Sequence, residues 1–244
     1  RTLSQIAAHP VTCYLFGAGK GDERVLFNKS TNVGNTSVHV SDDARIYGSI
    51  FGGGEDGHVM EDVTMSIGSS TLPTVYSSDP VLRAMNLSVS GTKEDGTYPY
   101  IGTWGTSYVD GNVFGGGRGF GGDAYTAGNV GGRVTLNISG GTMLGSIYGG
   151  GRLGSVGYDL RNVHETGYGQ MSTDESRGHV TIDISGGTIG NNHEFAYTPT
   201  DANVPKTLYE DGKLMHTKGG NVFAGGMGRR EDLNGNPIVH DLTD

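Results

Sequence analysis

The stretch VTLNISGGTMLGSIYGGG, residues 134–151, decides the fold that we predict for this chain. Apolar and polar residues alternate over residues 134–138, which is typical of a β-strand that buries one face. Residues 139–141, Ser-Gly-Gly, predict a turn, because glycine tolerates positive φ and close backbone approach. A second strand is expected over residues 142–148, before a glycine triplet that turns the chain again.

Both halves of this phrase recur along the chain. Internal repeats with a period of about 20 to 50 residues indicate repeat architectures. The interval between successive copies is sometimes about doubled, which indicates insertions between repeats. The first half recurs at residues 36–44 (TSVHVSDDA), 63–72 (VTMSIGSSTL) and 180–189 (VTIDISGGTI), and the second half at 15–19 (LFGAG), 49–54 (SIFGGG), 112–117 (NVFGGG) and 221–226 (NVFAGG).

We therefore predict an all-β fold, a parallel β-helix (β-solenoid) with long loop insertions at the coil corners. Apolar residues rarely recur at helical spacing, and the blade signatures of a propeller are absent. Successive coils would stack about 4.8 Å apart, so that equivalent positions form columns. Two columns are expected to point inward, one of Val63, Val134 and Val180 and one of Phe51, Phe114, Tyr148 and Phe223.

The chain is expected to be a single β-solenoid fragment of a larger repeat protein. Arg1 is not an initiator residue and no signal peptide is visible, so we expect a piece of something longer. The repeats are expected at roughly residues 1–35, 36–62, 63–133, 134–179 and 180–230, followed by a segment at 231–244 in which the pattern fades.

Composition excludes several classes of protein. The chain has 45 glycines but only 7 prolines, and its valines and isoleucines recur in phase with the glycines, which a disordered linker would not maintain. A net charge of −9 without a basic cluster argues against nucleic acid as a partner. No apolar run is long enough to span a membrane. Cys13 stands alone, so neither an internal disulfide nor a zinc site is expected.

Few residues suggest chemistry. Adjacent carboxylates are tools of glycoside hydrolysis, but neighbours in a strand point to opposite faces, so solvated turn charges are the favoured interpretation. GAGKG at residues 17–21 lacks the full phosphate-loop spacing, and the histidines show no ligand spacing. Calcium at the acidic turns stays conceivable, but we predict no catalytic residue, no cofactor and no metal. The carboxylate pairs are Asp42 with Asp43, Glu55 with Asp56, and Glu61 with Asp62.

A long excursion at residues 73–110 holds much of the aromatic content. Its candidate binding residues are Tyr98, Tyr100, Trp104 and Tyr108. Exposed aromatic side chains suit sugar faces and protein partners alike, because they offer a large apolar area with a polar edge. The alternative, that they pack back on the flank of the fold, stays open.

The repeated phrases resemble those of large adhesin-like cell-surface proteins of Bacteroides-type bacteria. The resemblance rests on residues 49–54, 111–117, 134–151, 180–190 and 219–226, and it leaves out the excursions. It implies an extracellular location at the cell surface and a structural or adhesive role. No catalytic residue carries over from it.

Three functions compete at this point. We favour an extracellular structural or adhesive repeat module that is not an enzyme. The alternatives are a carbohydrate-binding or polysaccharide-degrading β-helix, and a subunit of an extracellular filament or sheath that assembles through open strand edges. The expected partners are other copies or neighbouring repeats of the same protein, with glycans or host surface proteins as further candidates.

Overall fold

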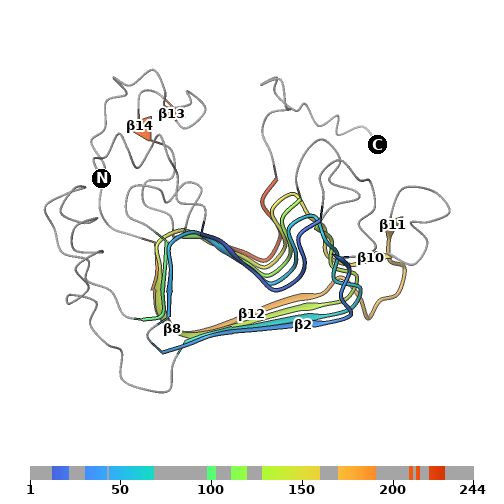
Figure 1. The fold of residues 1–244 in the computed structure, drawn as a ribbon, viewed down its shortest axis with the longest axis horizontal. Coiled ribbons are helices and arrows are strands. Elements are labelled where there is room, and N and C mark those ends of the chain that lie inside the picture. The colour runs from blue at the N-terminus through green and yellow to red at the C-terminus, as the bar shows by residue number, and fades with distance from the viewer. Residues whose placement is uncertain are drawn as a thin grey trace, which may run out of the picture.

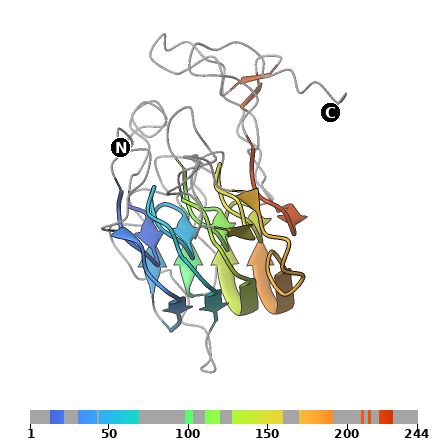
Figure 2. The ribbon, with the colours of Figure 1, turned by 90° about the vertical axis from the view of Figure 1, so that its right-hand side faces the viewer.

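The computed structural model describes residues 13–21, 31–42, 44–68, 98–102, 111–119, 128–159, 170–190, 209–210, 213–214 and 220–228. These residues form β-strands and connecting turns, without an α-helix among them. Two large parallel sheets face each other (Figure 1), and strands of successive repeats lie side by side within each sheet (Figure 2). Two short antiparallel pairs join β10 (Tyr158–Asp159) to β11 (Gln170–Met171) and β13 (Tyr209–Glu210) to β14 (Lys213–Leu214).

The first sheet is built from the second half of the repeated phrase. Each strand is only two residues long, and equivalent residues of successive repeats pair with each other. The glycine after each aromatic continues the ladder, as Gly52 N–H donates to Phe114 O at 2.9 Å and Gly115 N–H to Tyr148 O at 2.8 Å. In spatial order the strands are β1 (Leu15–Phe16), β4 (Ile50–Phe51), β7 (Val113–Phe114), β9 (Ile147–Tyr148) and β15 (Val222–Phe223).

The second sheet is built from the first half of the phrase and is strongly curled into a half-barrel. Its central strand, β8 (Val134–Met143), pairs along its beginning with β5 (Val63–Ile67) and along its end with β6 (Tyr100–Ile101). Strand β2 (Thr36–Val40) extends the β5 arm, and β3 (Arg45–Ile46) extends the β6 arm. Strand β12 (Val180–Ile189) lies on the other side of β8 and follows it around the bend.

The predicted parallel β-helix with turns at coil corners is wrong. No clear solenoid is formed by the described residues, whose two parallel sheets differ in strand length and curvature. The turn expected at residues 139–141 does not separate two strands, because β8 continues through it. Register shifts on either side of Gly186 in β12 take up the bend instead. The all-β class and the parallel pairing remain compatible with this arrangement.

The apolar core lies between the two sheets. Alternate residues of β2, β5 and β8 point into it from the curled sheet, and the first residues of β1, β4, β7 and β9 pack into it from the other sheet. Burial is nearly complete across the middle repeats. The core residues are Val38, Val40, Ile50, Met65, Ile67, Ile101, Val113, Leu136, Ile138, Met143 and Ile147.

A smaller apolar cluster lies where the glycine triplets meet the starts of the long strands. It contains the valine column, in which Val134 pairs with Val63 on one side and with Val180 on the other. Glycine is required beside it, because a Cβ placed on Gly149 would meet a methyl carbon of Val180 and, at 2.6 Å, the carbonyl oxygen of Ala224. The glycine triplets therefore set how closely successive repeats approach.

Candidate functional site

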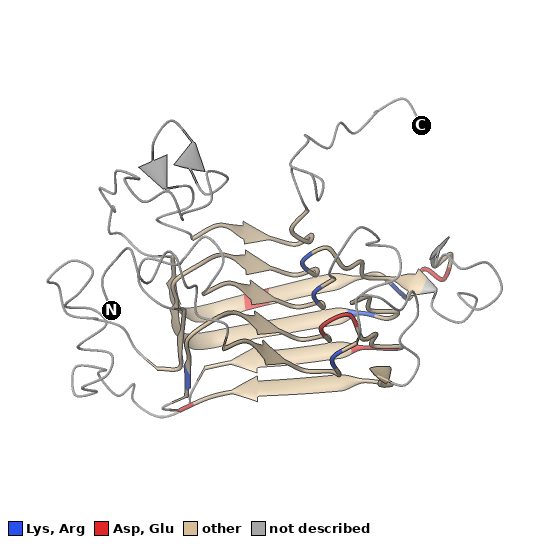
Figure 3. Ribbon diagram, turned by 45° about the horizontal axis from the view of Figure 1, so that its top comes forward, with Lys and Arg blue, Asp and Glu red and all other residues tan. Residues whose placement is uncertain are grey.

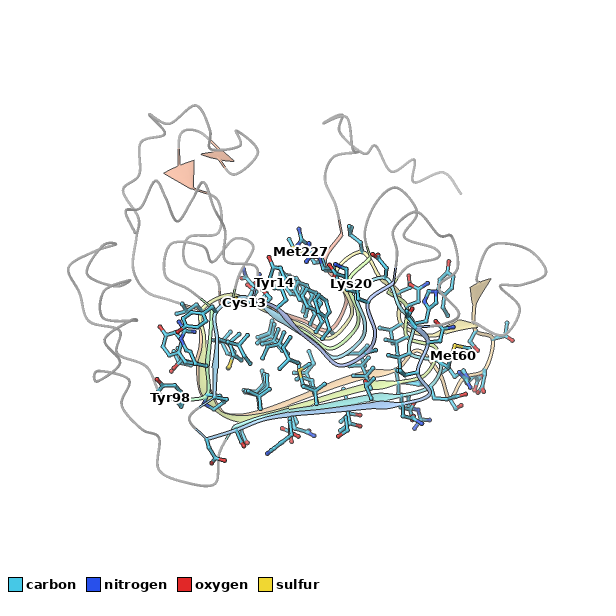
Figure 4. The ribbon with its side chains drawn as sticks, in the orientation of Figure 1. Cys13, Tyr14, Lys20, Met60, Tyr98 and Met227 are labelled. Carbon is cyan, nitrogen blue, oxygen red and sulfur yellow. The ribbon has the colours of Figure 1, made fainter. Side chains whose placement is uncertain are left out.

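An aromatic column runs along the outer face of the first sheet. The residue before each aromatic points into the core, so the aromatic side chain points to the opposite face. Tyr14 packs against the column with its edge (Figure 4). The sequence-based expectation that this column points inward with the valines therefore differs from what is found. The aromatic column consists of Phe16, Phe51, Phe114, Tyr148 and Phe223, with successive ring centroids 4.9, 4.7, 4.9 and 5.1 Å apart.

Charged side chains form a row next to the aromatic column. Glu55 lies between two cations of the neighbouring repeats, with Lys20 Nζ at 3.7 Å and Arg118 Nη1 at 3.8 Å from its carboxylate oxygens. The Arg118 guanidinium also stacks over the Tyr14 ring, 5.0 Å from its centroid. Charged residues gather in such connecting segments, whereas the described strands carry few of them (Figure 3). The row links adjacent repeats to one another.

The four candidate binding aromatics of the excursion differ in whether they are described and in how deeply they are buried. Trp104 and Tyr108 lie outside the described residues. Tyr98 is half-buried at the bend of the curled sheet (Figure 4). Tyr100 is only 1% exposed because it belongs to β6 and pairs with β3 and β8. Tyr100 is therefore part of the sheet and cannot contact a partner directly.

Arg45 holds Tyr100 in its place in the sheet. Its guanidinium lies 4.4 Å from the Tyr100 ring centroid and 4.6 Å from that of Tyr47, so it is placed between two aromatic faces. Arg45 Nη1 also donates to the carbonyl oxygens of Ile46, Tyr100 and Gly102, at 3.0, 3.1 and 2.6 Å. This cation fastens β3 to β6, which is a structural task.

Several described carboxylates of the three acidic pairs contact other repeats. Glu61 Oε2 accepts a hydrogen bond from Arg177 Nη2 at 2.7 Å, and Asp62 Oδ1 accepts one from Arg133 N–H at 2.8 Å. Asp56 is buried in a left-handed turn conformation, with φ of 60°. Asp42, with φ of 54°, is exposed on a turn, and Asp43 lies outside the described residues. In the pairs Glu55–Asp56 and Glu61–Asp62, the two carboxylates therefore have different surroundings.

Two ladders of polar side chains were missed by the sequence analysis. In the first, Asn112 N–H donates to Ser49 Oγ at 3.1 Å, Ser146 N–H to Asn112 Oδ1 at 2.9 Å, and Asn221 N–H to Ser146 Oγ at 3.2 Å. The signal was present in the sequence, since a serine or asparagine precedes the apolar-aromatic pair in four of its five copies, whereas Tyr14 precedes the first. The side chains of Ser49, Asn112 and Ser146 therefore each accept a hydrogen bond from a backbone N–H of the next repeat.

The second ladder runs through the connecting segments in the same way. His58 N–H donates to Asn32 Oδ1 at 3.4 Å, Asn129 N–H to His58 Nδ1 at 3.2 Å, and Ser155 N–H to Asn129 Oδ1 at 2.8 Å. His58 and Asn129 are fully buried. The position of His58 in this series indicates a structural histidine, not a metal ligand.

The last described repeat, formed by β12 and β15, differs from the inner ones because its apolar side chains are exposed. Ile184 is 40%, Val222 47% and Phe223 46% exposed. Their equivalents in the preceding repeat are Ile138, Ile147 and Tyr148. Ile138 is 1% exposed, Ile147 is fully buried and Tyr148 is half-buried. This end of the two sheets is the main apolar surface of the described residues.

Other kinds of site receive no support from the described part of the chain. No three His, Cys, Asp or Glu residues come together there as a cation-binding group, and Cys13 is exposed. Nor does any described segment form a helix long and apolar enough to cross a membrane. No protein-family model, curated protein or solved structure matches the chain.

Proposed function

We propose that this chain is a non-catalytic structural module of an extracellular cell-surface protein. The observation that carries the proposal is that the polar and charged side chains of the described residues hold repeats together. Glu55, Glu61, Asp62 and Arg118 contact backbone or side chains of other repeats. A glycoside hydrolase of the usual kind would need paired carboxylates held apart around a substrate.

The described contacts suit a scaffold because each inner repeat is held in the same way on both sides. Parallel backbone pairing, ring stacking and buried side-chain hydrogen bonds all run from one repeat to the next. A stacked aromatic pair contributes about 0.5–1.5 kcal/mol beyond its buried area, and a net hydrogen bond about 0.5–1.5 kcal/mol. Several such contacts at every repeat favour a rigid support.

We further propose that the segments inserted between repeats carry any adhesive contacts. Trp104 and Tyr108 remain the candidates for binding glycans or host surface proteins, with Tyr98 at the base of the same excursion. Tyr100 is withdrawn from this set because it is buried in the curled sheet. Aromatic side chains of this kind bind sugar faces and protein partners through their large apolar area.

Incubating the purified chain with a panel of polysaccharides, with release of reducing ends as the readout, tests the absence of catalysis. We expect no turnover, and turnover that Glu55→Gln or Glu61→Gln removes would refute a purely structural role. Binding of the same chain to a glycan array, compared with its Trp104→Ala variant and a Thr64→Ala control, tests the adhesive role. Binding that both variants retain equally would assign adhesion to another surface.

Antibodies raised against the chain test the location. They should label intact cells that produce the parent protein as strongly as permeabilised cells. Labelling that requires permeabilisation would refute the extracellular assignment while leaving the structural role open.

A further inference from the structure

The exposed end of the described sheets is an edge with unused pairing capacity. In the described part of the chain, β12 pairs with β8 and β15 with β9, each on one side only. Val134 N–H donates to His179 O at 2.9 Å, so the backbone groups of the next residue, Val180, face the other way, toward the free edge. The same alternation directs the N–H and C=O groups of Ile182 and Ile184 to that edge. Such an edge is a template for strand addition.

The opposite end of the two sheets is not exposed in this way. Val38 and Val40 of β2 are only 8% and 3% exposed, although β2 is the first strand of the curled sheet. Ile184, at the equivalent position of β12, is 40% exposed. A head-to-tail series of copies would need two complementary open ends, whereas the described residues have one exposed apolar end.

Ala224 opposes the addition of another parallel repeat. The equivalent residues in the inner repeats are Gly52, Gly115 and Gly149, and a Cβ on any of them would collide with the carbonyl oxygen of the same residue in the following repeat. For Gly149 that oxygen belongs to Ala224 and would lie 2.6 Å away. Ala224 carries such a Cβ. A further parallel repeat at the same spacing would therefore place its carbonyl oxygen against the Ala224 methyl group.

We propose that the edge formed by β12 and β15 binds the same edge of a second copy of this chain about a twofold axis. The axis would run perpendicular to both sheets, so that β12 pairs antiparallel with its counterpart and the sheets continue across the interface. Both inner faces then remain on the same side, and the exposed Ile184 and Phe223 side chains of the two copies become covered. Closed twofold dimers of this isologous kind are the commonest homo-oligomers.

The charge on β12 restricts which registers this pairing can adopt. Asp183 is the acidic residue of the strand, and its side chain lies on the outer face. A register centred on Asp183 would oppose two like charges, which is destabilising. Centring on Ile182 instead places Thr181 opposite Asp183 of the second copy and Val180 opposite Ile184. The pairing is independent of the proposed structural role, because an enzyme with this edge would dimerise in the same way.

Sedimentation equilibrium of the whole 244-residue chain tests the proposal. We expect a concentration-dependent species of twice the 25.5 kDa monomer mass. Ile184→Lys and, separately, Val222→Lys should raise the dimer dissociation constant about a hundredfold or more, because each buries a pair of like charges in the interface. The matched control, Thr64→Lys on the exposed outer face of β5, should leave it unchanged. A monomer at all concentrations, or a dimer unaffected by both edge variants, would overturn the proposal.

Spin labels distinguish the twofold arrangement from a head-to-tail one. In a Cys13→Ser background, labels on Thr181→Cys should give one short distance between identical positions. A head-to-tail pair would instead give a short distance between a label at residue 181 and one at Ser37→Cys in mixed samples, and none between identical positions. Either that second pattern of distances or filaments seen by electron microscopy would refute the twofold pairing.

Discussion

Phe114→Ala offers a quantitative test of the aromatic column. The Phe114 ring is 1% exposed and lies between two others, 4.7 Å from Phe51 and 4.9 Å from Tyr148, with interplanar angles of 2° and 10°. Burial of about 200 Å² at about 25 cal/mol per Å² contributes up to about 5 kcal/mol, and measured Phe→Ala losses in cores are about 3–5 kcal/mol. We expect a loss of about 3–5 kcal/mol in the free energy of unfolding.

Phe223→Ala is the matched control, because Phe223 has the same sequence context but ends the column. It is 46% exposed and stacks on one described ring, Tyr148, at 5.1 Å. Half the burial and one stacking partner correspond to a loss of about 1–2 kcal/mol. Urea unfolding at low protein concentration, with unchanged m-values, measures both losses. Equal losses for Phe114→Ala and Phe223→Ala would show that the column does not contribute to stability as the geometry implies.

Further predictions concern the close packing of the repeats. Gly116→Ala should cost about 1–3 kcal/mol, because its Cβ would lie 2.7 Å from a backbone nitrogen of the next repeat, whereas Gly225→Ala, in open space, should change stability by less than about 0.5 kcal/mol. Asn112→Ala should cost about 1–3 kcal/mol by leaving a buried N–H unsatisfied, and the exposed Asn137→Ala far less, both by urea unfolding. Ile147→Ala should cost about 2–5 kcal/mol as a fully buried core residue, and a negligible loss would refute the face assignment. Circular dichroism should show strand with little helix, and a helical share above about a third would contradict the all-β class.

The sequence predicted the strands and their partners better than it predicted the path between them. Alternation over residues 134–138 correctly indicates one buried face, and the repeated phrase indicates which residues lie opposite each other. The glycines at 140 and 141 were interpreted as a corner, but glycine within a strand also accommodates bulges and bends. Composition alone does not distinguish the two, because both need the same backbone freedom. In the structure the end of β8 pairs with β6 on one side and with β12 on the other, so strand pairing continues past these glycines.

The candidate site was harder to predict, because side-chain roles depend on neighbours from distant repeats. The side of the aromatic column follows from alternation, since Ile50 and Phe51 are adjacent and cannot both point into one core. Tyr100 appeared to be a loop aromatic because its surroundings are rich in Gly, Thr and Tyr. Its strand pairing with Arg45, 55 residues earlier in the chain, and with Thr142 of β8 shows that it is a sheet residue.

The free-energy cost of inserted segments decides whether a fold of this kind can support variable loops. The contacts between repeats come from the repeated phrase itself, so an insertion outside it removes none of them. The segment between Gly117 and Val134 is shorter than that between Gly151 and Val180, yet Val180 pairs with Val134 in the same way as Val134 pairs with Val63. Doubling the length of a flexible loop costs only about 0.6 kcal/mol of closure entropy, against about 3–5 kcal/mol for a single buried ring such as Phe114. Insertions can therefore vary in length and sequence while the sheets persist, which is the property that a surface module for display or adhesion requires.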